Sequence, residues 1–191
     1  MKAKDAGLRS RAAFKLKELN QKYNFIKRNF KILDLGAWPG GWMEVSSQIC
    51  GSGGLVVGID LKEIEDFPSP NIKAIAGDVR DEEALAKALE LSGGAYDVVL
   101  SDMAPKISGI REVDQAASRG CAELALWVAE RMLSTGGTLV IKVFKGNETE
   151  EFVKVARPMF NKLVRSELKS TRKTSSEFYL VGFGFKGAGQ G

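Results

Sequence analysis

Short apolar runs with few charges recur along the chain, and polar or glycine-rich segments separate them. The runs are rich in Val, Ile, Leu and Phe and are too short for core helices, which is typical of strands buried on both faces. We therefore predict strands at residues 30–36, 54–61, 72–79, 96–105 and 136–144. Closing strands are expected around 162–169 and 177–185.

Segments with helical spacing of apolar residues lie between these strands. Ala12, Ala13, Leu16 and Leu19 share one face behind Ser10, a residue type that favours helix N-termini. Acidic residues occupy the first turn of segment 81–91, where they suit the helix dipole. The predicted helices span residues 10–23, 42–50, 81–91, 112–133 and 149–160.

This alternation predicts the α/β fold class, with a largely parallel sheet covered by helices on both faces. A length of 191 residues suits one domain, so we predict a single domain over 1–191. Within it we expect a basic helical segment at 1–29 and a flexible tail at 187–191. Ligands of such sheets bind beyond the carboxyl ends of the strands, where the strand order reverses.

The composition is that of a globular protein, with 44% hydrophobic and 27% charged residues. The first residues, MKAKDAGLRS, lack the apolar core of a signal peptide, and no apolar run approaches the roughly 20 residues that span a bilayer. We therefore expect a cytoplasmic protein that has no membrane partner.

Charge is distributed unevenly, although the net charge is only +4. Residues 1–31 contain ten Lys or Arg and two acids, 32–161 contain twelve and twenty, and 162–191 contain six and two. Basic ends around an acidic middle suggest a cofactor-binding or catalytic domain whose ends meet a polyanion. Lysine-rich faces that are merely solvated would give the same pattern.

The chain contains no histidine, and its cysteines, Cys50 and Cys121, lie far apart. A zinc site or a redox CxxC pair is therefore excluded, and we expect no bound metal. Cysteines of this kind are usually small buried apolar residues. Acid-base chemistry must fall to Lys, Asp, Glu, Tyr or Cys, because the commonest base near neutral pH is missing.

The segment GAWPGG at 36–41 lies where the first strand turns into its helix. Glycines there allow a backbone to approach a ligand closely and to offer N–H donors. The spacing differs from the G-x-G-x-x-G of dinucleotide-binding proteins, and no Walker-type lysine follows, which disfavours ATP. A turn that needs glycine only for tight packing remains an alternative.

Acidic residues end the second and third strands. Asp60 follows Gly41 by nineteen residues, a place where an acid accepts the hydroxyls of a ribose. Asp78 ends the third strand and is suited to an adenine amine. Each alone is more often a turn former. Together with the glycine loop they predict a pocket for an adenosine compound.

Lys142 lies in the apolar run LVIKVF, and Asp102 ends the fourth strand in SDMAP. A lysine inside a buried strand is costly unless it is paired or has lost its proton. An edge-strand lysine that points to solvent is the plain alternative. A functional lysine beside Asp102 is the more specific interpretation.

The segments SRAAFKL, LDLGAWPGGW, SDMAPKISG, LVIKVFKG and SSEFYLV resemble, in order and spacing, the heat-shock-associated family of ribose 2′-O-methyltransferases that act on ribosomal RNA. The resemblance covers about residues 9–186. It implies a Rossmann-like methyltransferase fold with a mostly parallel seven-stranded sheet and S-adenosylmethionine as cofactor. It also implies a Lys-Asp-Lys-Glu tetrad and, as substrate, a ribose in large-subunit ribosomal RNA, which we expect to be that of a uridine.

The family's functional residues map onto matching positions of this chain. The implied catalytic residues are Lys15, Asp102, Lys142 and Glu177. The implied cofactor contacts are Gly36, Gly40, Gly41, Trp42, Asp60, Asp78 and Asp102. Inside the loop the family commonly has Ala-Ala-Pro, whereas Trp38 occupies the second Ala position here.

A ribose hydroxyl must lose its proton when it is methylated, and Lys142 is our hypothesis for the base. Burial and the ammonium of Lys15 would disfavour its charged form. Asp102 would orient Lys142 near the sulfonium, and Glu177 would accept a hydrogen bond from Lys142 or from the substrate. Both carboxylates oppose the depression of the lysine pKa, so positioning of the reactants can contribute more than proton removal.

Contacts with RNA phosphates are expected from basic residues near both ends of the chain and after the fourth and fifth strands. Few aromatic residues accompany them, which favours recognition of RNA backbone and shape, or of a structured particle such as the large ribosomal subunit. We expect the protein to act as a monomer. The candidate RNA contacts are Arg9, Arg11, Lys17, Lys106, Lys145, Arg172 and Lys173.

Other functions fit the sequence less well. An amino-methyltransferase needs an aromatic residue after its proline to stack on an extruded base, and Lys106 follows Pro105 here. A cytosine C5 enzyme needs a cysteine at that place, and the glycine spacing disfavours a dehydrogenase. Methylation of transfer RNA anticodon-loop riboses and a non-catalytic ribosome assembly factor remain open alternatives.

Overall fold

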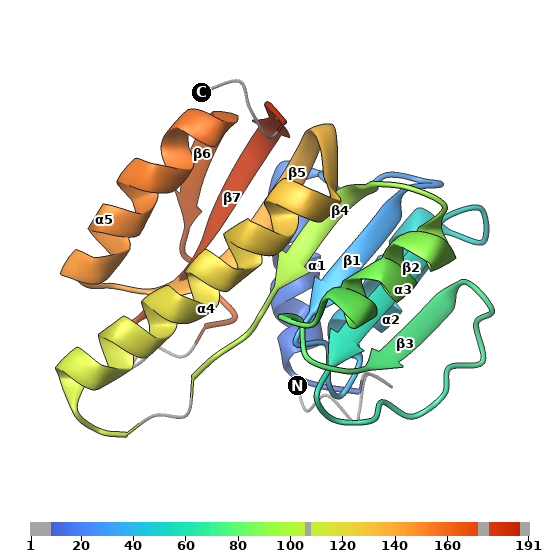
Figure 1. The fold of residues 1–191 in the computed structure, drawn as a ribbon, viewed down its shortest axis with the longest axis horizontal. Coiled ribbons are helices and arrows are strands. Elements are labelled where there is room, and N and C mark those ends of the chain that lie inside the picture. The colour runs from blue at the N-terminus through green and yellow to red at the C-terminus, as the bar shows by residue number, and fades with distance from the viewer. Residues whose placement is uncertain (1–8, 106–107, 172–175, 188–191) are drawn as a thin grey trace.

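The computed structural model describes residues 9–105, 108–171 and 176–187. Their strands form a seven-stranded sheet in the order β3-β2-β1-β4-β5-β7-β6 (Figure 1). β7 runs antiparallel to both of its neighbours, and the remaining pairs are parallel. The strands are β1 Lys31–Leu35, β2 Leu55–Asp60, β3 Ile72–Ala76, β4 Tyr96–Ser101, β5 Leu133–Phe144, β6 Phe160–Ser166 and β7 Glu177–Phe185.

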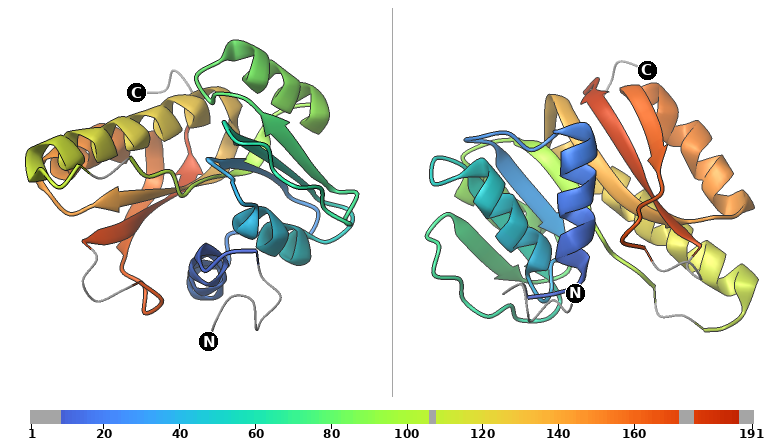
Figure 2. Two further views of the ribbon diagram at one scale, coloured as in Figure 1. Left: turned by 90° about the horizontal axis from the view of Figure 1, so that it is seen from below. Right: turned by 180° about the vertical axis from the view of Figure 1, so that it is seen from behind.

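Helices cover both faces of this sheet (Figure 2). α1 and α2 lie on one face, and α3, α4 and α5 lie on the other. The predicted Rossmann-like architecture is therefore confirmed. The helices are α1 Ala12–Tyr23, α2 Gly41–Cys50, α3 Glu82–Ser92, α4 Arg111–Met132 and α5 Asn147–Ala156, followed by the 3-10 turn η2 Arg157–Met159.

Two apolar cores, one on each face, account for the nearly continuous apolar runs. In β1, Leu33 and Leu35 pack into the core beneath α3, α4 and α5, whereas Ile32 packs into the core beneath α1 and α2. Successive side chains of a strand point to opposite faces, so a strand between two helical layers needs apolar residues at nearly every position.

Some boundaries differ from the predicted ones because of glycine and proline. β5 begins at Leu133, upstream of the predicted residue 136, and contains Gly136 and Gly137 beside a shift in its register with β4. α5 ends at Ala156, and Pro158 lies in η2, so β6 starts at Phe160 inside the segment predicted as helix. Proline lacks the N–H that would continue the helix.

The strand order reverses between β1 and β4, which lie side by side in the middle of the sheet. Asp34 and Leu35 of β1 pair with Leu100 and Ser101 of β4, so the segments that follow both strands leave the sheet together. This is the place where α/β sheets of this kind bind ligands. Among the described residues, no helix has the length and apolarity needed to cross a membrane.

Candidate active site

A pocket of about 610 Å³ opens at the carboxyl ends of the central strands. Its walls are the loop after β1, the ends of β2 and β3, the segment after β4 and one face of α4. Of the predicted cofactor residues, the pocket is lined by Gly36, Asp60, Asp78 and Asp102. Gly40, Gly41 and Trp42 are not among its lining residues.

The glycine loop is packed tightly on the side that faces the N-terminal segment. Gly40 has a φ of +100°, and a Cβ at this position would lie 2.5 Å from the Phe67 ring. A Cβ on Gly41 would lie 2.1 Å from Ser10 Oγ. Side chains at these positions would push the loop away from its support, so tight packing alone gives both positions a reason to be glycine.

Trp42 has a structural position between α1 and β7. Its side chain is buried, and its Nε1 donates a hydrogen bond to the main-chain oxygen of Ala12 at 2.7 Å. Its ring centroid lies 5.8 Å from that of Tyr179. The indole therefore joins the helix that carries Lys15 to the strand that begins at Glu177.

The two acids at the ends of β2 and β3 differ in their surroundings. Asp60 accepts hydrogen bonds from the main-chain N–H groups of Trp38 at 3.0 Å and Lys62 at 2.8 Å. Asp78 is paired with Arg80, and hydrogen bonds from this guanidinium are the main cause that lowers the pKa of Asp78. Both carboxylates border the pocket, as the sequence predicted.

Asp34, which the sequence interpretation left out, is a buried acid close to this pocket. Its side chain is 1% exposed, and its Oδ2 has no hydrogen-bond partner among the described residues. Burial raises the pKa of Asp34 well above its ordinary value, and the charges of Asp102 and Asp60 raise it further. An acid inside an otherwise apolar strand was the signal that could have identified it.

The residues present fit S-adenosylmethionine, the cofactor that the resemblance implies. The unpartnered oxygen of Asp34 and the nearby carboxylates of Asp60 and Asp102 favour a cationic ligand. S-adenosylmethionine carries a sulfonium and an ammonium group, together with the ribose and adenine that Asp60 and Asp78 are suited to bind.

Lys142 and Asp102 form the first half of the predicted tetrad. Lys142 is 8% exposed, and its Nζ donates to the main-chain oxygen of Asp102 and lies 3.1 Å from Asp102 Oδ1. The hydroxyl of Tyr179 donates to the same Oδ1 at 2.7 Å. Burial raises the pKa of Tyr179 far above its ordinary value, and the charge of Asp102 adds to the shift. Tyr179 therefore stays a neutral donor that fixes Asp102.

Sequence reasoning missed Tyr179, although two signals pointed to it. It follows Glu177 by two residues in SSEFYLV, and it lies opposite Lys142 in the β5–β7 pairing. The pairing follows from the sheet order, which the residues alone did not supply.

Lys15 and Glu177 form the second half of the tetrad. The Nζ of Lys15, on α1, is hydrogen-bonded to Glu177 Oε1 at the start of β7. Glu177 was expected to accept from Lys142 or from substrate; here its carboxylate accepts from Lys15 and, at 3.4 Å, from Thr171 Oγ1. The charge of Glu177 also contributes to the raised pKa of Tyr179, after burial and the effects of Asp102. Glu177 and Tyr179 are two residues apart in β7, so their side chains leave the strand on the same face.

Side chains attach α1 to the C-terminal half of the chain at further points. The carboxylate of Glu18 accepts the main-chain N–H groups of Lys169 at 2.7 Å and Ser170 at 2.9 Å. Lys22 donates to Ser166 Oγ at 3.2 Å. These contacts fix the helix that presents Lys15 to Glu177.

The predicted RNA contacts fall into three groups. The guanidinium of Arg9 donates to the main-chain oxygens of Glu65 and Asp66 and lies 3.7 Å from the centroid of the Phe67 ring. Lys145 is paired with Glu167 at 2.6 Å, whereas Arg11 and Lys17 lie at the surface of α1 and the residue before it. The remaining three, Lys106, Arg172 and Lys173, lie outside the described residues.

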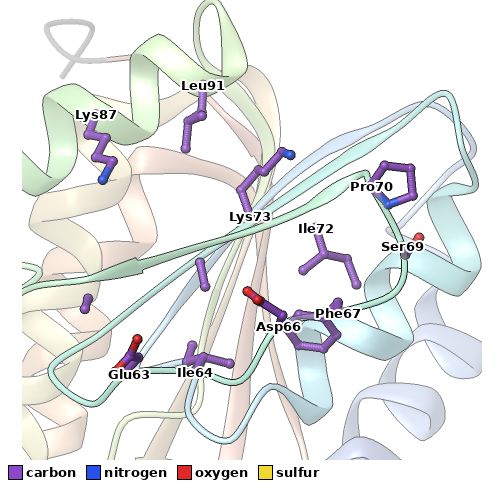
Figure 3. Close-up of a pocket in the computed structure, with 12 residues that line it drawn as sticks. Glu63, Ile64, Asp66, Phe67, Ser69, Pro70, Ile72, Lys73, Lys87 and Leu91 are labelled. Atoms are coloured by element: carbon purple, nitrogen blue, oxygen red, sulfur yellow. The ribbon is translucent and has the colours of Figure 1, made fainter.

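A second hollow, of about 460 Å³, lies along the edge strand β3 (Figure 3). Lys73 projects from this strand, and Lys87 and Leu91 approach from α3. It contains none of the predicted catalytic or cofactor residues, so we place the active site at the central pocket. The described residues contain no group of three metal-ligating side chains.

Comparison with protein families matches residues 8–185 to the FtsJ-like methyltransferase model. A protein of Methanothermobacter thermautotrophicus named ribosomal RNA large subunit methyltransferase E is 45% identical over 185 residues, which are 97% of this chain and 88% of the relative. A Pseudomonas fluorescens protein with the same name is 40% identical over 186 residues, with the same coverage of both chains.

Solved structures agree with this match. A Plasmodium falciparum protein described as a ribosomal RNA methyltransferase has a TM-score of 0.81 and 31% identity, over 94% of this chain and 99% of that chain. Aeropyrum pernix fibrillarin, in complex with S-adenosyl-L-methionine, has a TM-score of 0.58 and 16% identity, over 83% of this chain and 68% of its own. The second likeness concerns the fold alone.

Proposed function

The chain belongs to the FtsJ-like methyltransferase family, and from this premise we propose that it methylates the 2′-hydroxyl of a ribose in large-subunit ribosomal RNA. Membership makes it an S-adenosylmethionine-dependent methyltransferase. The single observation that carries the finer proposal is the pair formed by Lys142 and Asp102 beside the pocket, whose carboxylate also accepts the Tyr179 hydroxyl.

Three acids and the loop after β1 supply the cofactor site. When bound, S-adenosylmethionine supplies an electrophilic methyl group on a sulfonium. Asp60 would accept hydrogen bonds from the ribose hydroxyls and Asp78 from the adenine amine, while Asp102 provides negative charge for the cationic groups. Gly36 has a φ of +69°, a backbone conformation that a residue with a side chain would adopt only with strain.

We propose Lys142 as the group that accepts the proton of the ribose hydroxyl. The amine of Lys142 is nearly buried, and two contacts with Asp102 hold its Nζ in one place. Tyr179 in turn holds the Asp102 carboxylate. Fixed geometry matters as much as basicity, because oriented reactants can supply about 7–11 kcal/mol of the barrier reduction.

The choice of RNA rests on the relatives and on charge. Both bacterial and archaeal relatives are named for the large ribosomal subunit. The basic ends of the chain suit a polyanion, and α1 brings part of this charge to the tetrad through Lys15. The uridine follows from the family resemblance alone.

Transfer of labelled methyl from S-adenosylmethionine tests the proposal. Unmodified large ribosomal subunits, bare ribosomal RNA and transfer RNA serve as parallel substrates, and the product is digested to nucleosides. We expect a 2′-O-methyluridine from the subunit. Label in transfer RNA would support the proposed reaction and would show that the substrate is transfer RNA. Binding of cofactor without label in any RNA would favour an assembly factor.

Lys142→Met tests the proton acceptor. We expect kcat to fall by about 10²–10⁴-fold, because general-base catalysis contributes on that order. The dissociation constant of the cofactor, measured by calorimetry, should change by less than about threefold. Lys154→Met on α5, an exposed lysine, is the matched control and should retain wild-type turnover. Full activity in Lys142→Met would remove the lysine from the mechanism.

A further inference from the structure

Trp38 is a large apolar residue in an unusual place. Its side chain is 49% exposed, and it borders the central pocket at the position where the family commonly has alanine. Exposing so much of an indole to water forgoes the stabilisation of burial. Aromatic residues that remain partly exposed beside a pocket are typical of ligand contacts.

Hydrogen bonds fix the backbone around Trp38 to the carboxylate of Asp60. The N–H of Trp38 donates to Asp60 Oδ2 at 3.0 Å, and the N–H of Lys62 donates to Oδ1 at 2.8 Å. The Asp60 carboxylate, at the end of β2, thus fixes the backbone of both Trp38 and Lys62. The indole is therefore next to the acid that is suited to a ribose.

Lys62 covers one part of the indole, and the pocket borders another. The Nζ of Lys62 lies 4.0 Å from the centroid of the Trp38 ring, which is a favourable cation–π distance. Trp38 lines the pocket, whereas Lys62 is not among the described residues that line it. The lysine accordingly restrains the indole from outside and leaves its inner side for a ligand.

Apolar neighbours continue this wall along the pocket. Leu61, 74% exposed, and Val79 line it on the side of β2 and β3. An apolar wall with one carboxylate, here Asp60, suits a sugar ring, because the hydroxyls bond the acid while the C–H face packs on the aromatic ring.

We propose that Trp38 is a cofactor-contacting residue that packs against the ribose of the adenosine moiety and raises affinity for S-adenosylmethionine and S-adenosylhomocysteine. The inference rests on the assignment of this pocket to the cofactor and is independent of which RNA is methylated. Lys62 acts as a positioning residue, since it reaches the cofactor only through the indole.

Calorimetric titration with S-adenosylhomocysteine tests the contact without any turnover. We expect Trp38→Ala to raise the dissociation constant by about 3- to 10-fold, the effect of losing one aromatic packing contact. Trp38→Phe should restore most of the affinity. Lys62→Met should have an intermediate effect. Because Trp38 is half exposed, the melting temperature of the ligand-free variants should stay near that of the wild type.

Intrinsic fluorescence supplies a second readout. Saturating S-adenosylhomocysteine should change the tryptophan emission of the wild type, and Trp38→Phe should lose that change. Trp127→Phe is the matched control, because Trp127 also has a cation over its ring, at 3.9 Å from Arg131, but does not line the pocket. The ligand-induced change should persist in this control.

Kinetics separate the cofactor from the RNA. At saturating S-adenosylmethionine, Trp38→Ala should have the wild-type KM for RNA. An unchanged cofactor affinity with a raised KM for RNA would overturn the proposal and assign the indole to RNA. Unchanged affinity for both would overturn it as well. Failure to methylate any RNA would refute the proposed substrate but leave the binding result interpretable.

Discussion

Asp34 shows at the scale of one residue how a binding site differs from a core. An acid with an unpartnered oxygen inside a buried strand destabilises the ligand-free protein. Its neighbours in β1, Leu33 and Leu35, are fully buried in the core on the opposite face of the sheet. Such a cost is typical of a ligand-binding site, which agrees with the cationic cofactor proposed for this pocket.

Asp34→Asn should stabilise the ligand-free protein at neutral pH by about 1–3 kcal/mol. The folded-state pKa of Asp34 is raised above the roughly 3.9 of an unfolded chain. Its favourable contribution is therefore complete below about pH 3.9 and is lost as pH rises through the raised pKa. Urea unfolding between about pH 4 and 8 should give a flatter profile for the variant.

The same substitution should weaken cofactor binding, because the amide offers no negative charge to the cationic groups. Glu90→Gln, an exposed acid on α3, serves as the control for both measurements. A variant with unchanged pH dependence and unchanged cofactor affinity would show that the pKa of Asp34 is the same in the folded and unfolded chains and that Asp34 takes no part in binding.

At the scale of the element, α1 and the residues that precede it connect the parts of the site. Lys15 pairs with Glu177, and Glu18 holds the turn after β6. Arg9 holds the loop between β2 and β3 through two carbonyl oxygens and the Phe67 ring. This loop follows Asp60, so the N-terminal segment supports the cofactor pocket as well as the tetrad.

Arg9→Ala should therefore act on the cofactor more than on RNA. We expect the dissociation constant of S-adenosylmethionine to rise by about 3- to 10-fold, because two hydrogen bonds and a cation–π contact of the supporting loop are lost. The salt dependence of RNA binding should stay as in the wild type, since carbonyl oxygens of the protein already accept from the guanidinium.

Arg11→Ala is the matched comparison, because Arg11 is exposed and was predicted to contact a phosphate. If it does so, this variant reduces the slope of log affinity against log salt by about one. A reduced slope in Arg9→Ala, with unchanged cofactor affinity, would restore the original interpretation of Arg9 as an RNA contact.

At the scale of the molecule, the pocket joins elements that pack into both cores. Its walls include the ends of β2 and β3, the segment after β4 and part of α4. A ligand that contacts all of them binds the folded state and has no such site on the unfolded chain, so its binding raises the free energy of unfolding. Cofactor binding and global stability should consequently be linked.

S-adenosylhomocysteine at 100 times its dissociation constant should add about 2.7 kcal/mol to the free energy of unfolding. For a chain of this size we expect the melting temperature to rise by about 5–11 °C. Differential scanning calorimetry measures the shift. ATP at the same concentration is the control and should give no comparable rise. Equal shifts in melting temperature with S-adenosylhomocysteine and with ATP would contradict a pocket selective for this cofactor.

The sequence by itself determined the features that depend on neighbouring residues, which are the strands and the polar residues at their ends. Apolar runs located β1, β2, β4, β5 and β7 because strands buried on both faces need apolar residues throughout. Polar residues at strand ends located Asp60, Asp78 and Asp102, since the carboxyl ends of parallel strands share one edge. The family resemblance supplied the tetrad residues and the cofactor. The single-domain division, the monomeric state and the RNA contacts stay predictions.

Only the tertiary structure decided which of these residues meet. Lys15 and Glu177 are 162 positions apart, and they pair because α1 docks beside β7. Tyr179 faces Asp102 because β7 inserts antiparallel beside β5. Arg9 donates to the loop after β2 because that loop offers it two carbonyl oxygens. Periodicity records the backbone preference of neighbouring residues, whereas such contacts depend on sheet order and helix docking, which are set by the packing of the whole chain.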